Sequence, residues 1–558
     1  MLIKKICSMA QSCDTKCRYK NDNDIQSSAI KERKEKSQRA KSATKSTSQS
    51  SPIERKEPIM RTFSKSKLMA LRQCPKRLWL EIHRQDLRED SAATQTSFQV
   101  GHQVGDIAQR IYDPEGCGAL IDIEAEGFNR VFERSAELLQ SSQPVFEAGF
   151  RAGGVLAFAD VMLPIQKDDA MVWRMVEVKS STSVKNYHRD DVAVQSFVAH
   201  TAGVPLEAIA LAHIDSSWVY PGNEDYRGLL KENDLTSEAF SRAEEVKAWI
   251  TQAQAIDAEP IEPDMATGNQ CWAPFECGFH GYCSRNDPVL EFPVSWLPRF
   301  SSARIEQLAE IGVIDLRDVP DAQLNDRQRR VKKHTLDGTV FFDADGAAAD
   351  LEPYPLPAYF MDFETIQFAI PIWKGTRPYQ QIPFQFSMHR LDTSGLLKHS
   401  AFLDLSGDDP REAFSAALIA ACGSEGPVFA YNAGFEMGRI RELAECYPQM
   451  SAALLAINER VVDLLPIARE RYYHPTQQGS WSIKKVLPAI VPDLSYDALD
   501  GVQDGGMAME AFLEALHPGV SPERKAAIEQ QLLAYCQLDT YAMVRLWQVF
   551  AGRTDLEL

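Results

Sequence analysis

The chain has 558 residues, of which 44% are hydrophobic and 25% charged, a composition ordinary for a soluble protein of two to four domains. It contains no run of about 18 apolar residues and no apolar N-terminal segment of the secretory kind, so we expect a cytoplasmic protein without a membrane span. The net charge of −18 weighs against nucleic-acid partners without excluding them, because metal-binding carboxylates add negative charge where a cation reverses it.

Residues 1–60 are rich in Ser, Lys and Thr and lack apolar periodicity, which predicts a disordered basic tail. Residues 61–290 alternate helical and strand patterns, which predicts a first α/β domain. The expected helices are Leu68–Trp79, Phe98–Tyr112 and Asp191–His200, and the expected strands are Val145–Phe150, Val155–Leu163 and Val172–Val178.

Residues 291–350 read as a connector with two short helices around Gly312. This pattern resembles one helix-hairpin-helix unit, which binds phosphate through helix N-termini, and a plain packing linker is the alternative. Residues 351–558 are expected to form a second α/β domain. Its expected strands are Ala358–Phe363, Phe384–Leu391, His399–Leu405 and Pro427–Tyr431, and its expected helices are Arg411–Cys422, Phe435–Tyr447 and Pro522–Phe550.

A first group of polar residues carries the pattern of a metal-dependent hydrolase. Glu177 and Lys179 are two positions apart on a predicted strand and so share a face, and Asp160 ends the preceding strand. Two carboxylates can bind Mg²⁺, and the lysine can orient a water molecule or stabilise charge on a phosphate. Gln195, on the following helix, can orient the lysine or the substrate. An exposed Glu–Lys pair on a strand is the alternative interpretation.

Four cysteines indicate a metal cofactor. Cys271, Cys277 and Cys283 are separated by two gaps of five residues, and Cys74 lies far upstream. Four cysteines suit a [4Fe–4S] cluster, and zinc is the alternative. Such a cluster would join the two ends of the first domain.

These motifs together resemble the iron–sulfur nucleases of the RecB-like superfamily, including the CRISPR-adaptation exonucleases. The resemblance covers residues 62–290 and rests on QCPKRLW, the Asp and Glu-x-Lys motif, the glutamine and the three late cysteines. It implies a PD-(D/E)XK fold, dependence on Mg²⁺ or Mn²⁺, and cleavage of DNA, usually single-stranded. It further implies that Asp160 and Glu177 bind metal and that Lys179 is catalytic. Family members often add another ligand, for which His102 is favoured here over Glu147. Ala199 stands where the family often has tyrosine, which puts the role of Gln195 in doubt.

A second group of carboxylates is spread over the last 200 residues. Asp362 and Glu364 end a predicted strand, Glu436 follows a strand-to-helix junction, and Tyr535 and Asp539 share one face of the last helix. Four converging carboxylates can bind two divalent ions that act on one phosphodiester, and a tyrosine can position the attacking water.

The order of these motifs resembles the DEDDy pattern of DnaQ-like exonucleases, which implies an RNase H-like fold and 3′–5′ exonuclease chemistry. Glu436 departs from that pattern, which has aspartate, and Asp463 is a nearby alternative carboxylate. The segments IPFQFSMH, YYHPTQQGSWSIKKVLP and YCQLDTYAM extend the likeness. With them, residues 62–550 as a whole resemble a bacterial family in which an exonuclease-like domain follows the iron–sulfur nuclease domain.

Three hypotheses of function follow from the sequence. The first is a dual nuclease that acts on single-stranded or free-ended DNA, with RNA open for the second domain. In the second hypothesis only the RecB-like site cuts, and the C-terminal domain binds ends. The third is a non-catalytic scaffold that binds nucleic acid. Protein partners are not predicted.

Overall fold

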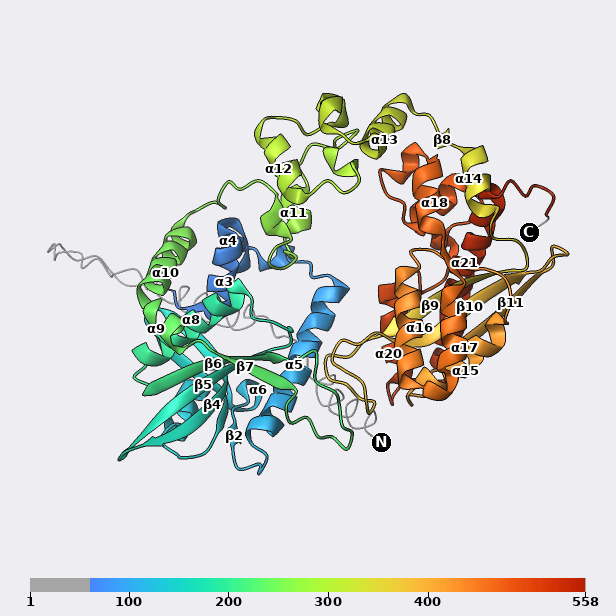
Figure 1. The fold of residues 1–558 in the computed structure, drawn as a ribbon. Coiled ribbons are helices and arrows are strands. Elements are labelled where there is room, and N and C mark those ends of the chain that lie inside the picture. Colours follow the sequence, from blue (N-terminus) through green and yellow to red (C-terminus); the bar gives the residue numbers. More distant parts are fainter. Residues whose placement is uncertain (1–60, 557–558) are drawn as a thin grey trace, which may run out of the picture. The chain divides into compact units, whose positions relative to one another are not determined.

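The computed structural model describes residues 61–556, so the predicted tail at residues 1–60 lies outside the described part (Figure 1). The described chain is a mixed α/β protein with sheets of seven, five and two strands. None of its described helices is long and apolar enough to cross a membrane.

The seven-stranded sheet belongs to the first half of the chain. Its strands run in the order β2-β3-β4-β5-β6-β7, and β1 pairs with β4. Neighbours from β3 to β5 are antiparallel, whereas β5 and β6 are parallel because helix α8 (Asn186–Thr201) crosses between them. The strands are β1 (Phe63–Ser64), β2 (Ala119–Leu120), β3 (Val145–Ala152), β4 (Val155–Lys167), β5 (Ala170–Lys179), β6 (Leu206–Ile214) and β7 (Leu230–Asp234).

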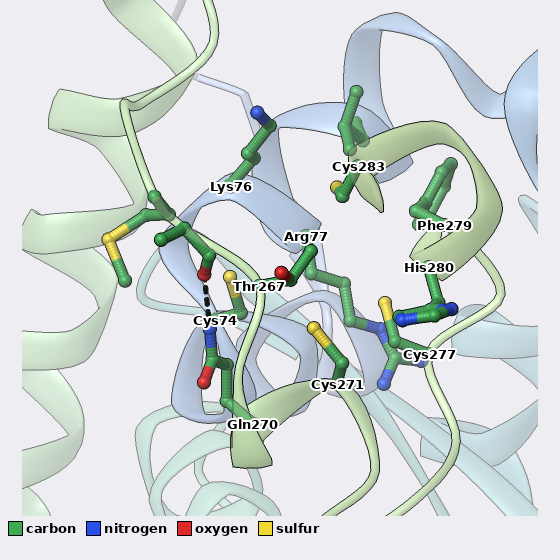
Figure 2. Close-up of a pocket in the computed structure, with 13 residues that line it drawn as sticks. Cys74, Lys76, Arg77, Thr267, Gln270, Cys271, Cys277, Phe279, His280 and Cys283 are labelled. Carbon is green, nitrogen blue, oxygen red and sulfur yellow. Dashed lines mark hydrogen bonds between the residues drawn. The ribbon is translucent and has the colours of Figure 1, made fainter. Parts of the chain in front are cut away.

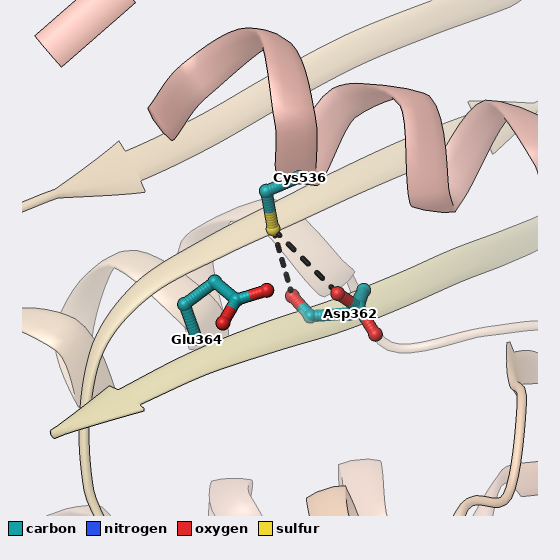
Figure 3. A group of neighbouring side chains, drawn as sticks. All are labelled: Asp362, Glu364 and Cys536. Carbon is teal, nitrogen blue, oxygen red and sulfur yellow. Dashed lines mark hydrogen bonds between the residues drawn. The ribbon is translucent and has the colours of Figure 1, made fainter. Parts of the chain in front are cut away.

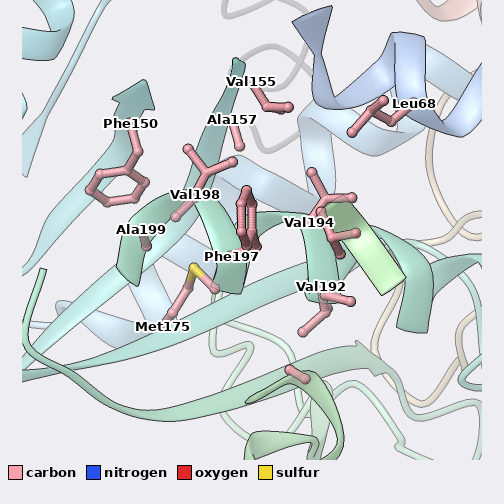
Figure 4. Close-up of a cluster of buried hydrophobic side chains, with 14 of the residues drawn as sticks. Leu68, Phe150, Val155, Ala157, Met175, Val192, Val194, Phe197, Val198 and Ala199 are labelled. Atoms are coloured by element: carbon pink, nitrogen blue, oxygen red, sulfur yellow. The ribbon is translucent and has the colours of Figure 1, made fainter. Parts of the chain in front are cut away.

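Helices pack on both faces of this sheet. Helix α8 packs on one face together with α3 (Lys65–Gln73) and α10 (Ala243–Ala258), and their apolar side chains form the main core with Phe150, Ala157 and Met175 (Figure 4). Helix α5 (Ala92–Tyr112) contacts β4 and β5. All three expected strands and the helices Phe98–Tyr112 and Asp191–His200 are therefore confirmed, with longer bounds.

The expected helix Leu68–Trp79 is wrong as a single element, because it is two helices. Helix α3 ends at Gln73 and α4 (Pro75–His83) begins one residue later, with Cys74 extended between them at φ −161° and ψ 124°. Proline disfavours helical geometry in the residue before it and is well suited to the first turn of a helix. Pro75 therefore places Cys74 at a corner between two helices.

The five-stranded sheet belongs to the second half, in the order β11-β10-β9-β12-β13. Strands β9 to β11 are antiparallel, and β12 and β13 continue parallel to β9. The strands are β9 (Ala358–Ile366), β10 (Ile382–Leu391), β11 (Leu397–Leu403), β12 (Val428–Ala430) and β13 (Val461–Asp463), and the helices include α15 (Arg411–Cys422), α16 (Gly434–Cys446), α17 (Pro448–Glu459), α18 (Leu464–Arg471), α19 (Ile483–Ile490), α20 (Gly505–Leu516) and α21 (Pro522–Phe550). The expected strands and helices of this half are confirmed.

The connector packs against residues 469–481. Its strand β8 (Phe341–Phe342) pairs with β14 (Tyr472–Tyr473), and Gly479, at φ 76°, lies so close to Trp296 that an added Cβ would be 1.6 Å from its carbonyl oxygen. Its helices are α12 (Ser302–Glu310), α13 (Asp326–Asp337) and α14 (Ala344–Leu351). Only the first helix expected beside Gly312 is present. The second is a 3₁₀ turn, Leu316–Asp318, because Pro320 disfavours helical geometry at Val319.

Candidate functional site

Three neighbouring strands align a row of carboxylates. Glu147 comes from β3, Asp160 from β4 and Glu177 from β5, and these strands are neighbours in the sheet. The three carboxylates lie close enough to interact electrostatically. The Val178 amide donates to Asp160 Oδ2 at 2.6 Å, which fixes that carboxylate.

Two lysines and a glutamine surround this row, which we call the first carboxylate cluster (Glu147, Asp160, Glu177 and Asp191). Lys179 Nζ lies 2.6 Å from Glu177 Oε1 and 2.6 Å from Asp191 Oδ2. Lys65 Nζ lies 3.0 Å from Glu177 and 2.9 Å from Asp191. Gln195 Nε2 donates to Glu177 Oε2 at 2.6 Å, so it orients the carboxylate rather than the lysine.

Lys65 and Asp191 were not predicted as site residues from the sequence. Asp191 lies four positions before Gln195 on α8, and this i, i+4 spacing is a signal that could have found it. Lys65 begins α3, more than 100 residues from Glu177, and no local pattern marks it. The two lysines leave this buried cluster with more negative than positive groups.

The carboxylates of the first cluster have pKa values shifted in opposite directions. Burial and then Glu177 raise the pKa of Asp160 well above its ordinary value, and they raise that of Glu147 to about 7. Burial alone would also raise the pKa of Glu177, but Lys179 and Lys65 lower it below its ordinary value. Crowded carboxylates that resist ionisation are relieved when a divalent cation binds among them.

The two residues considered as an additional ligand lie in different surroundings. Glu147 is half-buried and has φ 57°, an uncommon conformation for a non-glycine residue in a strand. Such outliers concentrate at functional sites, where the surrounding structure maintains them. His102 is exposed on α5, near Asp106, which in turn is near Glu147. The preference for His102 stays a prediction, while the geometry favours Glu147.

The four predicted cysteines line one small pocket. Cys74 lies at the corner between α3 and α4, whereas Cys271, Cys277 and Cys283 come from the segment after α10, and their sulfur atoms gather around the pocket (Figure 2). Gln73 joins the two segments by donating to the carbonyls of Gln270 and Phe275, both at 2.7 Å.

The chemistry of this pocket fits a cluster held by thiolates. Burial raises the pKa of Cys283 to about 11, with Lys76 opposing the shift and the other three thiols adding to it. All four cysteines are free of disulfides. Lys76 and Arg77 also line the pocket and supply positive charge beside the sulfur atoms. Four thiols gathered beside two cations suit a metal centre that needs them ionised.

The second half of the chain brings together a different acidic group. Asp362 and Glu364 project from β9 towards Cys536 on α21, and the ligand atoms of the three lie within 4.8 Å of one another (Figure 3). Cys536 Sγ donates to Asp362 Oδ2 at 3.7 Å. Burial, then Asp539, Glu364 and Glu436, raise the pKa of Asp362, so all four predicted carboxylates lie close enough to interact. We call these four residues the second carboxylate cluster.

Two tyrosines and a lysine border the second cluster. Tyr496 donates to Asp539 Oδ1 at 2.5 Å, and its ring centroid is 6.3 Å from that of Tyr535. Lys484 Nζ lies 5.3 Å from the Tyr496 ring and 5.2 Å from the Tyr535 ring. Tyr535 and Asp539 share a face of α21 as predicted, whereas Tyr496 and Cys536 were not assigned from the sequence.

Glu436 is in place as the carboxylate at the second position of the motif. It is 4% exposed in the first turn of α16, and its Oε2 has no hydrogen-bond partner in the described residues. Burial raises its pKa to about 7. Asp463 instead accepts hydrogen bonds from the amides of Asn432 and Leu465, both at 2.9 Å, so it organises backbone beside the cluster.

Comparison with known proteins adds one finding. Residues 359–482 match the model of a domain of unknown function, DUF2779. Among curated proteins there is no match. The matched segment contains Asp362, Glu364 and Glu436 and ends before Tyr535 and Asp539.

Proposed function

We propose that the chain is a metal-dependent nuclease that hydrolyses phosphodiester bonds of DNA at two separate sites. The observation that carries this proposal is the pair of buried carboxylate clusters, each with a candidate for positioning water or phosphate beside it. Carboxylate oxygens are the ligands that Mg²⁺ and Mn²⁺ prefer.

The two sheets support the folds that the sequence resemblance implies. In the first half, Asp160 and Glu177 lie on adjacent strands, and a crossover helix carries Gln195 back against them, which supports a PD-(D/E)XK fold. In the second half, β9 carries Asp362 and Glu364 between one antiparallel and one parallel neighbour, and α21 supplies Asp539, which supports an RNase H-like fold.

At the first site, Asp160 and Glu177 would bind the metal ion, together with Glu147 or His102. A divalent ion there would polarise the phosphate and activate water. Lys179 is positioned to orient that water or to stabilise developing negative charge on the phosphate. Lys65 contacts the same oxygen of Glu177 as Lys179 does, and the other oxygen of Asp191, while Gln195 fixes the second oxygen of Glu177.

At the second site, Asp362, Glu364, Glu436 and Asp539 would bind two divalent ions, which together stabilise both the attacking and the leaving oxygen. Tyr535 is the residue to position the attacking water, because burial and then Asp539 raise its pKa and keep its hydroxyl protonated. Tyr496 occupies one oxygen of Asp539 and thereby orients the other.

Cys74, Cys271, Cys277 and Cys283 would hold a [4Fe–4S] cluster, with zinc as the alternative metal. In this proposal the cluster is structural, since it joins the corner between α3 and α4 to the segment that follows α10.

The test uses the full chain purified without air. Four thiolate ligands predict about four iron atoms per chain and a brown colour. Cleavage of end-labelled single-stranded DNA is then measured with Mn²⁺ for Lys179→Ala, Asp362→Ala and the double variant. Lys167→Ala and Asp408→Ala, both at exposed positions, are the matched controls.

We expect each single variant to lose one class of product and the double variant to lose both. Loss of all cleavage in Lys179→Ala alone would mean that only the first site cuts and the second binds ends. A colourless protein that contains zinc and fails to cleave DNA with any divalent metal would overturn the dual-nuclease proposal and leave a binding scaffold.

A further inference from the structure

A second, larger cavity lies between the connector and the C-terminal half. Its volume is about 570 Å³, and its walls come from the connector, the residues that follow β12, and the segment from α18 to α19. Its polar lining includes Arg299 and Arg327 of the connector, Asn432 after β12, and Arg469 and Ser482.

The cavity is basic although the whole chain is acidic. Three arginines line it and no aspartate or glutamate does. Within residues 61–556 the side chains of Arg299 and Arg469 have no hydrogen bond or ion pair. Arg327 pairs with Glu470, but its Nε is buried without a hydrogen-bond partner. Unpaired guanidinium groups that converge on one cavity are suited to phosphate, which they bind in a bidentate manner.

The fold fixes the walls of this cavity. Gly479 packs directly on the carbonyl of Trp296, which leaves no room for a Cβ atom, and Arg330 donates to the carbonyl of Glu470 at 2.7 Å. Arg299 and Asn432, which both line the cavity, have φ 54° and φ 66°, a left-handed conformation that is uncommon for arginine and that asparagine adopts more readily. The cavity is therefore a built feature of the connector and the C-terminal half.

Two short segments lead from the cavity to the second carboxylate cluster. Asn432 lines the cavity, its amide donates to Asp463, and Glu436 follows one helical turn later. Ser482 also lines the cavity, and Lys484 follows it by two residues and lies over the rings of Tyr496 and Tyr535. A strand that occupied the cavity would thus end near the carboxylates.

We propose that this cavity binds backbone phosphates of a single DNA strand whose 3′ end lies at the second carboxylate cluster. The inference rests on the proposed nuclease function and adds the path of the substrate to it. Arg299 and Arg469 bind phosphate directly, and the connector is part of the binding site rather than a passive linker.

The experiment measures binding of a fluorescent single-stranded oligodeoxynucleotide to the full chain at several salt concentrations. All proteins carry Lys179→Ala and Asp362→Ala, so that the DNA is not cleaved. The test variant adds Arg299→Gln and Arg469→Gln, and the matched control adds Lys333→Gln and Lys398→Gln, which remove two exposed charges elsewhere. Arg469→Lys tests whether charge alone suffices.

Removing two phosphate contacts is expected to weaken DNA binding about tenfold or more. The slope of log K against log salt concentration should become less steep by about 1.4, since each contact with a single strand contributes about 0.7. The control and Arg469→Lys are expected to keep the slope. Equal slopes for the test variant and the control would overturn the proposal, while cleavage by the wild type would leave the nuclease function intact.

Two further results would also decide the matter. If the cavity binds inorganic phosphate or a mononucleotide as tightly as the oligonucleotide, it is a small-anion site and the proposed path is wrong. If the wild type neither binds nor cleaves DNA, the nuclease function fails, and the substrate path fails with it.

Discussion

Replacing Cys74 tests whether the four-cysteine pocket joins distant parts of the chain. A metal centre shared by Cys74 and Cys271 closes a loop of about 200 residues, and the chain-entropy model for cross-links assigns on the order of 5 kcal/mol to such a loop. Cys74→Ala opens that loop even if the other three cysteines retain metal. We therefore expect the free energy of unfolding of the first half to fall by about 5 kcal/mol in cluster-loaded protein and by little in cluster-free protein.

The assay is hydrogen exchange of the β4 and β5 amides at increasing urea concentration without air, paired with iron content and visible absorbance. This measurement isolates one sheet, which matters because a chain of several domains does not unfold in a single two-state step. Cys117→Ala is the matched control, since Cys117 is exposed and does not line the pocket. Equal exchange and equal iron content in Cys74→Ala and the control would refute the reasoning.

Lys65→Met is expected to slow cleavage at the first site by about 10²-fold, because it removes a contact that positions Glu177. Cleavage at the wild-type rate would contradict this role of Lys65. Tyr535→Phe should slow the second site by about 10²-fold or more with little change in DNA affinity, and an unchanged rate would remove the tyrosine from the chemistry. Burial and Asp539 raise the pKa of Glu364 to about 8, and metal binding needs the ionised carboxylate. Mg²⁺ should therefore raise the melting temperature more at pH 8.5 than at pH 6. Equal increases in melting temperature at the two pH values would argue against a metal at the second carboxylate cluster. Gly479→Ala should loosen the connector, because the added Cβ atom would overlap the carbonyl of Trp296. We expect faster proteolysis between residues 291 and 350, and a rate of proteolysis equal to that of the wild type would contradict this prediction.

Local signals predicted most of the secondary structure. The last helix was expected at Pro522–Phe550 and has those bounds, because Ser521 caps its N-terminus and proline occupies the first turn. Helix Arg411–Cys422 also has its expected bounds, with glycine directly after it. Periodicity likewise placed Glu177 and Lys179 on one strand. Each of these predictions depends on residues that are close together in the sequence.

The parts that sequence did not predict depend on contacts between distant residues. Lys65 reaches Glu177 across more than 100 residues, and Tyr496 reaches Asp539 across 43. Neither residue belongs to a motif, so only the assembled fold reveals the contact. The break at Cys74 is different, because the signal was present in Pro75 and was overridden by the apolar periodicity of the surrounding segment.

The net charge of −18 illustrates why a sum over residues decides little about partners. Part of the negative charge is concentrated in two buried clusters, where burial and mutual repulsion raise carboxylate pKa values and where divalent cations would reverse the local charge. No aspartate or glutamate lines the arginine-lined cavity, and only Arg327 of its three arginines is paired with an acidic residue, Glu470. At physiological ionic strength exposed charges farther away than about 8 Å are largely screened. A strand of DNA at the proposed sites would therefore meet cations and arginines, while most of the negative surface would be screened from it.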